Sequence, residues 1–456
     1  MKKSRKIVLV LFAVTILAVL SVFGWFVSRV FEGECPGIQV DPLPAFLSKG
    51  QPFTVKVTDD KRGLRLLQVT VNQSGREHRV LKRTFPFQGF FNCEGTHQHT
   101  ESFTVDPRVL NLAQGRAELH VQVFDHSRRG GGDGNQTQVT HAMMVDTMPP
   151  SIRALTRLHY INQGGACLII YQASSDVEKS GVTVEELSFP GYPVQGEKEK
   201  GVHTCYFAVP HDAGKKPAIR LWAEDRAGNQ SRVSFYHQVR EKRFRQDRMN
   251  ITDAFLERIL PYFSSVQFEP DATPLEKYLK INNDLRKEND RILKKLPAES
   301  VDTKLWDGTW LRLRNAATMA QFADHRTYYY KGNKVDEKDH LGVDLASLAN
   351  SPVPAANHGR VLFAGELGIY GNAVVLDHGQ RLTSLYGHLS SIQVSKGQDV
   401  QKGDTLGTTG STGLAGGDHL HFSILVNGVF VNPIEWWDGH WIRDNVQKKM
   451  ALLSDR

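Results

Sequence analysis

The stretch HLHFSILVNGVFVNP, residues 419–433, decides the fold of the C-terminal third of the chain. Apolar residues lie on both sides of an Asn-Gly pair, which is typical of two strands joined by a tight turn. The same pattern of short apolar runs and glycine turns continues upstream, through GRVLFAGE, GNAVVLDHG and RLTSLYGHL at residues 359–366, 371–379 and 381–389. We therefore predict a compact all-β domain over residues 305–445.

Three histidine-bearing stretches fall inside this predicted domain: HLGVD at 340–344, YGHLS at 386–390 and HLH at 419–421. Residues two or four apart on a strand point to the same face, so His340 can converge with Asp344, and His419 with His421. Two imidazoles and one carboxylate make a typical open zinc site. The spacing indicates a metal centre.

Histidine spacing alone is a weak signal, because a lone strand histidine is more often a hydrogen-bonded core or surface residue. His97 and His99, in THQHT, have the same spacing, and we interpret them as exposed strand residues without a nearby carboxylate partner. His358 and His378 have the character of turn residues. What favours the C-terminal set is its joint occurrence in one glycine-rich domain.

Together, HLGVDLA, YGNAVVLDHG, LYGHLS, KGQDVQKGDTLGTTGSTGLAGGDHLHFSI and VNP resemble the lysostaphin or LytM type of peptidoglycan zinc endopeptidase, the β-lytic metallopeptidase family. The resemblance covers about residues 325–436. It implies that His340, Asp344 and His421 bind one Zn²⁺ per catalytic domain, and that His388 and His419 are catalytic. The chain departs from the common family pattern at Leu341, where many members have glycine, and at Asp418, where proline is common.

The N-terminal residues MKKSRK precede an uncharged stretch from Ile7 to Ser28, which has about the length that an apolar helix needs to cross a bilayer. We predict a membrane anchor over residues 1–29 of a single-pass protein in the bacterial cytoplasmic (inner) membrane. The basic flank would stay in the cytoplasm, which places the body in the periplasm or extracytoplasmic space. A cleavable signal peptide is the alternative, and it exports the body as well.

Residues 36–240 show apolar alternation with a period of two, as in Phe53, Val55 and Val57. A weak repeat relates AELHVQVFDHSRRGGGDGNQTQV, from Ala117, to AIRLWAEDRAGNQSRV, from Ala218, and Pro149 and Pro150 lie between the copies. We predict two immunoglobulin-like β domains, at 30–147 and 148–240. Export makes disulfides plausible, and the preferred pairing is Cys35 with Cys93 and Cys167 with Cys205. Four free thiols are the alternative.

Residues 241–304 are predicted to be a helical linker. Apolar residues at helical spacing run from Tyr278 to Leu296, with Pro274 at the expected start and Pro297 just past the end. This stripe is more typical of a packing face than of a coiled coil. Three tyrosines, Tyr328, Tyr329 and Tyr330, precede the first candidate ligand and either gate the groove or pack around a hairpin.

The expected fold class is thus mainly β and multidomain, with an N-terminal transmembrane helix, two immunoglobulin-like β-sandwiches, a helical linker and a C-terminal all-β zinc metallopeptidase domain. The net charge of +7 is spread along the chain, and no nucleic-acid motif is present. The resemblance implies a membrane-anchored zinc metalloendopeptidase that hydrolyses peptide bonds of peptidoglycan, using zinc-activated water and histidine acid/base assistance. The alternative is a cell-wall-binding regulatory scaffold that activates another murein hydrolase. The expected partners are peptidoglycan peptides, the cytoplasmic membrane and proteins bound by the β domains.

Overall fold

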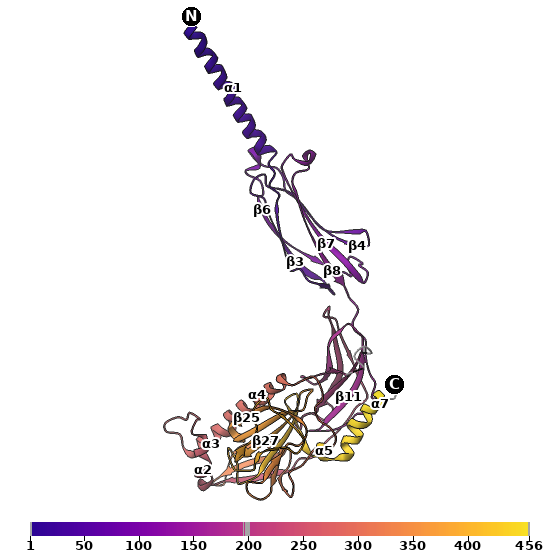
Figure 1. Ribbon diagram of the computed structural model, residues 1–456, viewed down its shortest axis with the longest axis vertical. Coiled ribbons are helices and arrows are strands. Elements are labelled where there is room, and N and C mark those ends of the chain that lie inside the picture. Colours follow the sequence, from indigo (N-terminus) through magenta and orange to yellow (C-terminus); the bar gives the residue numbers. More distant parts are fainter. Residues whose placement is uncertain (1, 195, 197–200, 455–456) are drawn as a thin grey trace. The chain divides into compact units, whose positions relative to one another are not determined.

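The computed structural model describes residues 2–194, 196 and 201–454, and the chain packs into two compact units. The first unit comprises residues 1–149 and 226–229, and the second comprises 150–225 and 230–456. Figure 1 follows the chain from its N-terminal helix through the strands of both units. The fold is mainly β with an apolar N-terminal helix, which confirms the expected fold class.

The N-terminal helix α1 (Lys2–Val30) is long and apolar enough over Arg5–Val30 to cross a membrane. The hydroxyl groups of Thr15 and Ser21 donate to the carbonyl oxygens four residues earlier, so both are satisfied within the helix. This arrangement suits a lipid environment, where polar groups must find partners in their own segment. A signal sequence has the same length and composition, so that alternative stays open.

The first unit continues with two sheets that enclose a common apolar core. Phe53, Val55 and Val57 are all buried on one face of β3, as their alternation predicted. One sheet has the order β1 (Gly37–Asp41), β3 (Gln51–Thr58), β6 (Gln98–Val105). The other has the order β2 (Phe46–Leu47), β8 (Gln136–Val145), β7 (Gly115–Asp125), β4 (Leu64–Gln73), β5 (Arg76–Thr84).

The second β module also has two main sheets, each of four strands. One has the order β14 (Tyr192–Pro193), β15 (Val202–Ala208), β11 (Ala166–Ala173), β9 (Ile152–Ala154). The other has the order β13 (Leu187–Pro190), β12 (Val177–Val184), β16 (Ile219–Asp225), β17 (Gln230–Val233). Strand β10 (Tyr160–Asn162) lies between β9 and β11 in the chain. It pairs in parallel with β18 (Gln238–Arg240), which follows β17.

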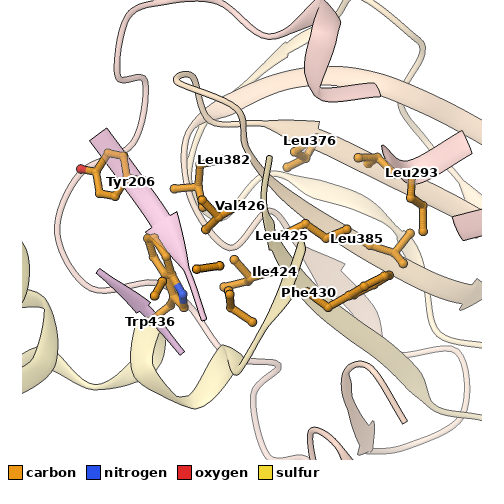
Figure 2. Close-up of a cluster of buried hydrophobic side chains, with 14 of the residues drawn as sticks. Tyr206, Leu293, Leu376, Leu382, Leu385, Ile424, Leu425, Val426, Phe430 and Trp436 are labelled. Atoms are coloured by element: carbon orange, nitrogen blue, oxygen red, sulfur yellow. The ribbon is translucent and has the colours of Figure 1, made fainter. Parts of the chain in front are cut away.

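This second module shares a continuous hydrophobic core with the C-terminal domain. Figure 2 shows Tyr206, from β15, in the same cluster as Trp436, Leu382 and Ile424. The C-terminal helix α7 (Lys448–Ser454) adds a second contact, because Lys449 donates from Nζ to the Leu168 carbonyl oxygen at 2.8 Å. The second module therefore packs as part of the unit that carries the histidines.

The disulfide prediction is wrong, because Cys35, Cys93, Cys167 and Cys205 are all free. Strands β11 and β15 pair Cys167 with Phe207 and Cys205 with Ile169, so the two cysteines are offset by two residues. Such diagonal neighbours lie about 7–8 Å apart, beyond the reach of a disulfide. Cys35 and Cys93 are both exposed thiols.

The segment before the C-terminal domain is only partly helical. Its first element is a strand, β19 (Gln246–Ile251), which pairs in parallel with β21 (Asp324–Tyr330). Strand formation here depends on that distant partner, and sequence periodicity does not reveal it. The helix starts where Pro274 predicted, with Thr273 as N-cap in a capping box. The helices are α2 (Asp253–Ile259), α3 (Pro274–Lys280) and α4 (Arg286–Lys295), with a π-helical turn at Ile281–Leu285 between the last two.

The C-terminal domain is built on an eight-stranded sheet with a small three-stranded sheet beside it. The large sheet has the order β20 (Ala317–Ala320), β23 (Val343–Ala346), β31 (Leu420–Val426), β27 (Leu382–Leu389), β26 (Asn372–Asp377), β25 (Gly359–Glu366), β29 (Asp399–Val400), and β32 (Val429–Val431) pairs with β31. The small sheet contains β24 (Pro352–Pro354), β30 (Thr405–Thr408) and β28 (Ser391–Ile392). Short helices follow at α5 (Pro433–Trp437) and α6 (Gly439–Ile442), so the end of the predicted all-β region is helical.

Candidate metal centre

Strand register brings the candidate ligands together at one end of the large sheet. Asp344 on β23 lies directly opposite His421 on β31, and His421 lies opposite Gly387 on β27, one residue before His388. His340 is the last residue of β22 (Asn333–His340), which belongs to another sheet. The spacing of His340 and Asp344 had suggested that both lie on one strand, but they lie on different strands. They converge because the chain turns between them.

Gly342, in that turn, allows the close approach. A Cβ atom at this position would lie 2.5 Å from Cε1 and Nε2 of the His421 ring and 2.6 Å from the Ser423 hydroxyl. Real side chains do not tolerate such distances, so any larger residue would displace the His421 ring. The sequence analysis did not single out Gly342, although its place inside HLGVD is a usable signal.

Three ligand atoms face one common point. His340 Nε2 lies 2.9 Å from Asp344 Oδ1 and 3.1 Å from His421 Nδ1, and His421 Nδ1 lies 2.9 Å from the same carboxylate oxygen. All three residues are buried. Two ligand atoms at zinc bonding distance in a tetrahedron are about 3.3 Å apart, so this spacing is close to that of three zinc ligands.

The hydrogen bonds on the far sides of the two rings fix their tautomers. His340 donates from Nδ1 to the Gln321 carbonyl oxygen at 3.0 Å. His421 donates from Nε2 to Ser423 Oγ at 3.0 Å, because the Ser423 hydroxyl hydrogen is already donated to the Leu341 carbonyl oxygen at 2.7 Å. In the neutral rings the nitrogens that face Asp344 are therefore acceptors, so a positive charge, from a bound cation or a proton, is needed between these atoms. The residues fit a zinc ion and can hold a metal.

His388 and His419 form a second pair beside these three residues, with ring centroids 4.8 Å apart. His388 donates from Nδ1 to the Thr412 carbonyl oxygen and His419 from Nδ1 to that of Gly417, both at 2.8 Å. Each ring thereby leaves its Nε2 atom for other partners. His419 Nε2 lies 3.6 Å from Asp344 Oδ1. His388 has a φ of 63°, a left-handed conformation rare for a residue with a side chain and typical of functional sites.

Burial and charge move the pKa values of this pair in opposite directions. Burial and the neighbouring histidines hold the pKa of His388 well below its usual value. Burial also opposes the charged form of His419, but the Asp344 carboxylate outweighs it and raises the His419 pKa. For Asp344 itself, burial is outweighed by the surrounding histidines, and its pKa is lowered well below the usual value. Asp344 is thus a carboxylate.

The five histidine and aspartate residues line a cleft of about 500 Å³. Its other walls come partly from the segment before the domain, which contributes Met249, Phe255 and Tyr278. Tyr328 is buried, lines the cleft and packs edge-on against the Tyr278 ring, with centroids 6.1 Å apart. Packing around the β21–β22 hairpin therefore accounts for this tyrosine, and gating stays a hypothesis.

Three other histidines that the sequence analysis considered, His97, His99 and His378, have structural partners. His97 and His99 are half-buried, and the expectation that they are exposed is wrong: His97 bonds the main chain of Asp59 and Asn92, and His99 lies 3.0 Å from a carboxylate oxygen of Glu101. His378 is fully buried directly after β26, between the His358 carbonyl oxygen and Ser384 Oγ.

Residues 338–433 match the model of peptidase family M23. The chain carries a peptidase family M23 domain at its C-terminal end. Within it, the chain is 41% identical over 95 residues to the DD-carboxypeptidase/endopeptidase Mpg of Neisseria meningitidis, and 38% identical over 96 residues to the peptidoglycan DD-endopeptidase ShyA of Vibrio cholerae. Each alignment covers 21% of this chain and 22% of the relative, so the chain matches only about a fifth of the length of either relative.

The M23 domain is also similar to a protein with a different printed role, the murein hydrolase activator NlpD of Salmonella dublin, at 35% identity over 101 residues, 22% of this chain and 26% of the relative. Among solved structures, the catalytic domain of lysostaphin from Staphylococcus simulans aligns with 27% of this chain and 94% of its own length, at 28% identity and a TM-score of 0.24.

Proposed function

We propose that the protein is a zinc metalloendopeptidase that cleaves peptide bonds of peptidoglycan, cross-links or stem peptides, while anchored in the bacterial inner membrane by α1. The observation that carries the proposal is the convergence of one ring nitrogen each from His340 and His421 with an Asp344 carboxylate oxygen, next to His388 and His419, whose Nδ1 atoms bond main-chain carbonyl oxygens. The names of the M23 relatives supply the substrate class.

His340, Asp344 and His421 would hold the zinc ion, and zinc in such a site supplies a Lewis acid that polarises a peptide carbonyl and lowers the pKa of water. His388 and His419 would transfer the protons. Both residues line the cleft, so the pair can take a proton from the attacking water and return one to the leaving amine. An imidazolium there would also stabilise the negative charge that develops on the carbonyl oxygen.

The cleft wall from Met249, Phe255 and Tyr278 would bind and orient the peptide. These side chains are apolar or aromatic, so a peptide bound against them would displace water beside the histidines. A water-poor environment around the reacting bond would strengthen electrostatic stabilisation of the transition state. The position of the body outside the cytoplasm is part of the proposal, since peptidoglycan is there.

The test compares two classes of variant in the full-length, detergent-solubilised protein. His421→Ala should lose bound zinc and activity together. His388→Ala should keep zinc while losing about 100-fold or more of the release of murein peptides, measured by mass spectrometry. His440→Ala changes an exposed histidine outside the cleft and serves as the control. The proposal fails if zinc-loaded protein releases nothing from any cell-wall chemotype.

The similarity to an activator of murein hydrolases supports a second candidate, a scaffold that activates another enzyme. The two candidates differ in what the zinc site is needed for. In cells, His388→Ala should abolish the function of an enzyme and leave that of a scaffold intact, because this substitution retains the metal ligands.

A further inference from the structure

A second cluster of titratable groups lies far from the zinc site in the sequence, in the first β module. Glu32 lies two residues after the end of α1, Asp59 follows β3, and Asp125 is the last residue of β7. Their side chains are only 7%, 4% and 0% exposed, and one carboxylate oxygen from each lies within 4.8 Å of the others. Three buried carboxylates in one place need a compensating charge.

One oxygen of Asp59 has no partner. Its Oδ1 accepts hydrogen bonds from the backbone N–H groups of Lys61, Arg62 and Gly63, at 3.2, 2.8 and 2.6 Å. Its Oδ2 is buried and accepts no hydrogen bond from any residue that the structure describes. Since buried acceptors are almost always satisfied, this oxygen indicates that a ligand belongs here.

The amide of Asn135 is surrounded by more oxygens than it can satisfy. Its Nδ2 atom lies 2.7 Å from Asp125 Oδ2, 3.0 Å from Glu32 Oε1, and 3.1 Å from the carbonyl oxygens of both Glu32 and Glu34. An amide nitrogen carries two hydrogens, so it cannot donate to four acceptors. Carboxylate and carbonyl oxygens therefore crowd one small volume without enough donors.

Among the described side chains, the Arg62 guanidinium attracts the three carboxylates but forms no ion pair with them. Among the residues described, no lysine or arginine forms an ion pair with Glu32, Asp59 or Asp125. Arg62 is buried nearby, but its Nη1 donates to the Phe91 carbonyl oxygen, and its guanidinium lies over the Phe87 and Phe91 rings. Burial accordingly raises the pKa of both Asp59 and Glu32, and the neighbouring carboxylates add to that shift.

We propose that Glu32, Asp59 and Asp125 bind a calcium ion, with the main-chain carbonyl oxygens of Glu32 and Glu34 as further ligands. The available ligand atoms are carboxylate and carbonyl oxygens, and oxygen ligands suit Ca²⁺. Mg²⁺ requires a near-ideal octahedron and keeps most of its water, and Zn²⁺ prefers the nitrogen and sulfur ligands that this cluster lacks. The proposal does not depend on the function assigned to the M23 domain.

The ion would tie three separate pieces of chain together. Glu32 belongs to the segment after α1, where Ser127 already donates to the Glu32 carbonyl oxygen and Arg129 to that of Phe31. Asp59 comes from the turn that follows β3, and Asp125 is the last residue of β7. Calcium would therefore fix the end of the membrane-proximal segment to the module, and its removal would loosen that junction.

The test is isothermal titration of chelator-treated, full-length protein in detergent with CaCl₂. Wild type should bind calcium with a dissociation constant of about 0.1–1 mM, as extracellular modules do. Asp59→Asn and Glu32→Gln should each weaken this binding at least about tenfold, while Asp60→Asn, an exposed neighbour, should bind like wild type. In the second sequence repeat, Asp225 and Asn229 occupy the places that Asp125 and Asn135 have in the first. The calcium binding of each variant is therefore compared with that of wild type, so that only the binding lost at the Glu32 cluster is counted.

A second readout keeps the proposal testable if one variant folds poorly. Calcium should raise the thermal unfolding midpoint of wild type and of Asp60→Asn, and should not raise that of Asp59→Asn or Glu32→Gln. The proposal is overturned if wild type shows no saturable binding at about ten times the expected dissociation constant. It is also overturned if both variants bind as wild type does, or if Mg²⁺ at equal concentration competes fully.

Discussion

Arg326 donates from Nη2 to Oδ2 of Asp344 at 3.0 Å, while the other oxygen of that carboxylate faces His340 and His421. One carboxylate oxygen of Asp344 therefore bonds a guanidinium, and the other faces the candidate metal position. This contact holds the orientation of Asp344, and groups that orient metal ligands affect metal affinity. Arg326 comes from β21, which pairs in parallel with β19.

Replacing Arg326 by methionine should therefore lower zinc affinity or peptidase activity by about 10- to 100-fold, because Asp344 loses its orienting partner. Competition with a chromogenic chelator measures the affinity. Arg248→Met provides the control, since Arg248 is exposed and lies over the Tyr329 ring on the neighbouring strand. Equal zinc affinity in both variants and wild type would show that Arg326 has no positioning role.

Ser423→Ala should also weaken zinc binding, by about tenfold or more. Without the hydroxyl, His421 loses the acceptor for its Nε2 hydrogen, and the tautomer that presents Nδ1 to the metal is no longer favoured. The same chelator competition measures the change. Ser395→Ala removes an exposed hydroxyl outside the cleft and should leave zinc affinity unaltered. A Ser423→Ala variant that binds zinc like wild type would contradict the tautomer argument.

Gly342→Ala should disrupt the zinc site by steric means. The added methyl group would push the His421 ring and the Ser423 hydroxyl away from their positions, and overpacking of this kind typically costs about 1–3 kcal/mol. We expect reduced zinc content after dialysis, measured by atomic emission. Gly214→Ala is the matched control, because a Cβ atom there meets nothing within 4 Å. Full zinc content in Gly342→Ala would rule out the close approach.

Stability should depend on pH through Glu435, which joins α5 to the second β module. Its oxygens accept hydrogen bonds from Asn162 Nδ2 at 2.7 Å and from the Ala166 N–H at 3.0 Å. Burial raises its pKa to about 7. The folded state therefore holds this proton more tightly than the unfolded state. The resulting stabilisation is complete below the ordinary carboxyl pKa and is lost as pH rises through about 7.

The measurement is the difference in unfolding midpoint between wild type and Glu435→Gln, which cannot ionise. From about pH 4.5 to 8, wild type should lose stability relative to this variant, by at most about 3 kcal/mol, because one pKa unit corresponds to about 1.4 kcal/mol. Glu366→Gln replaces an exposed carboxyl group, and its unfolding midpoint should follow that of wild type across this pH range. A constant difference between wild type and Glu435→Gln over this range would contradict the raised pKa.

The four thiols should react in two classes. Cys35 and Cys93 are exposed, so they should be alkylated in the folded protein. Cys167 and Cys205 are buried, and burial raises the pKa of both thiols, so they should react only after denaturation. Peptide mapping by mass spectrometry after stepwise alkylation distinguishes the classes. A Cys167–Cys205 disulfide in the non-reduced map would contradict the strand register.

Much of the site could be predicted from sequence because its groups lie in short, ordered motifs. HLGVD, YGHLS and HLH contain the five residues that the structure brings into one cleft, and the Asn-Gly turn of 419–433 indicates the hairpin that carries His421. The apolar N-terminal helix and the strands of the first module follow from local periodicity in the same way. Local patterns suffice where a residue's position depends mainly on its neighbours in the chain.

Only the tertiary structure decided which distant residues support those motifs. Arg326 reaches Asp344, Ser423 fixes the His421 tautomer and Asn162 meets Glu435 because particular strands and helices pack in one register. The same register separates Cys167 from Cys205. The two had been predicted to pair because they lie in one module. Side-chain contacts between strands depend on offsets of one or two residues, and sequence periodicity does not specify the offset.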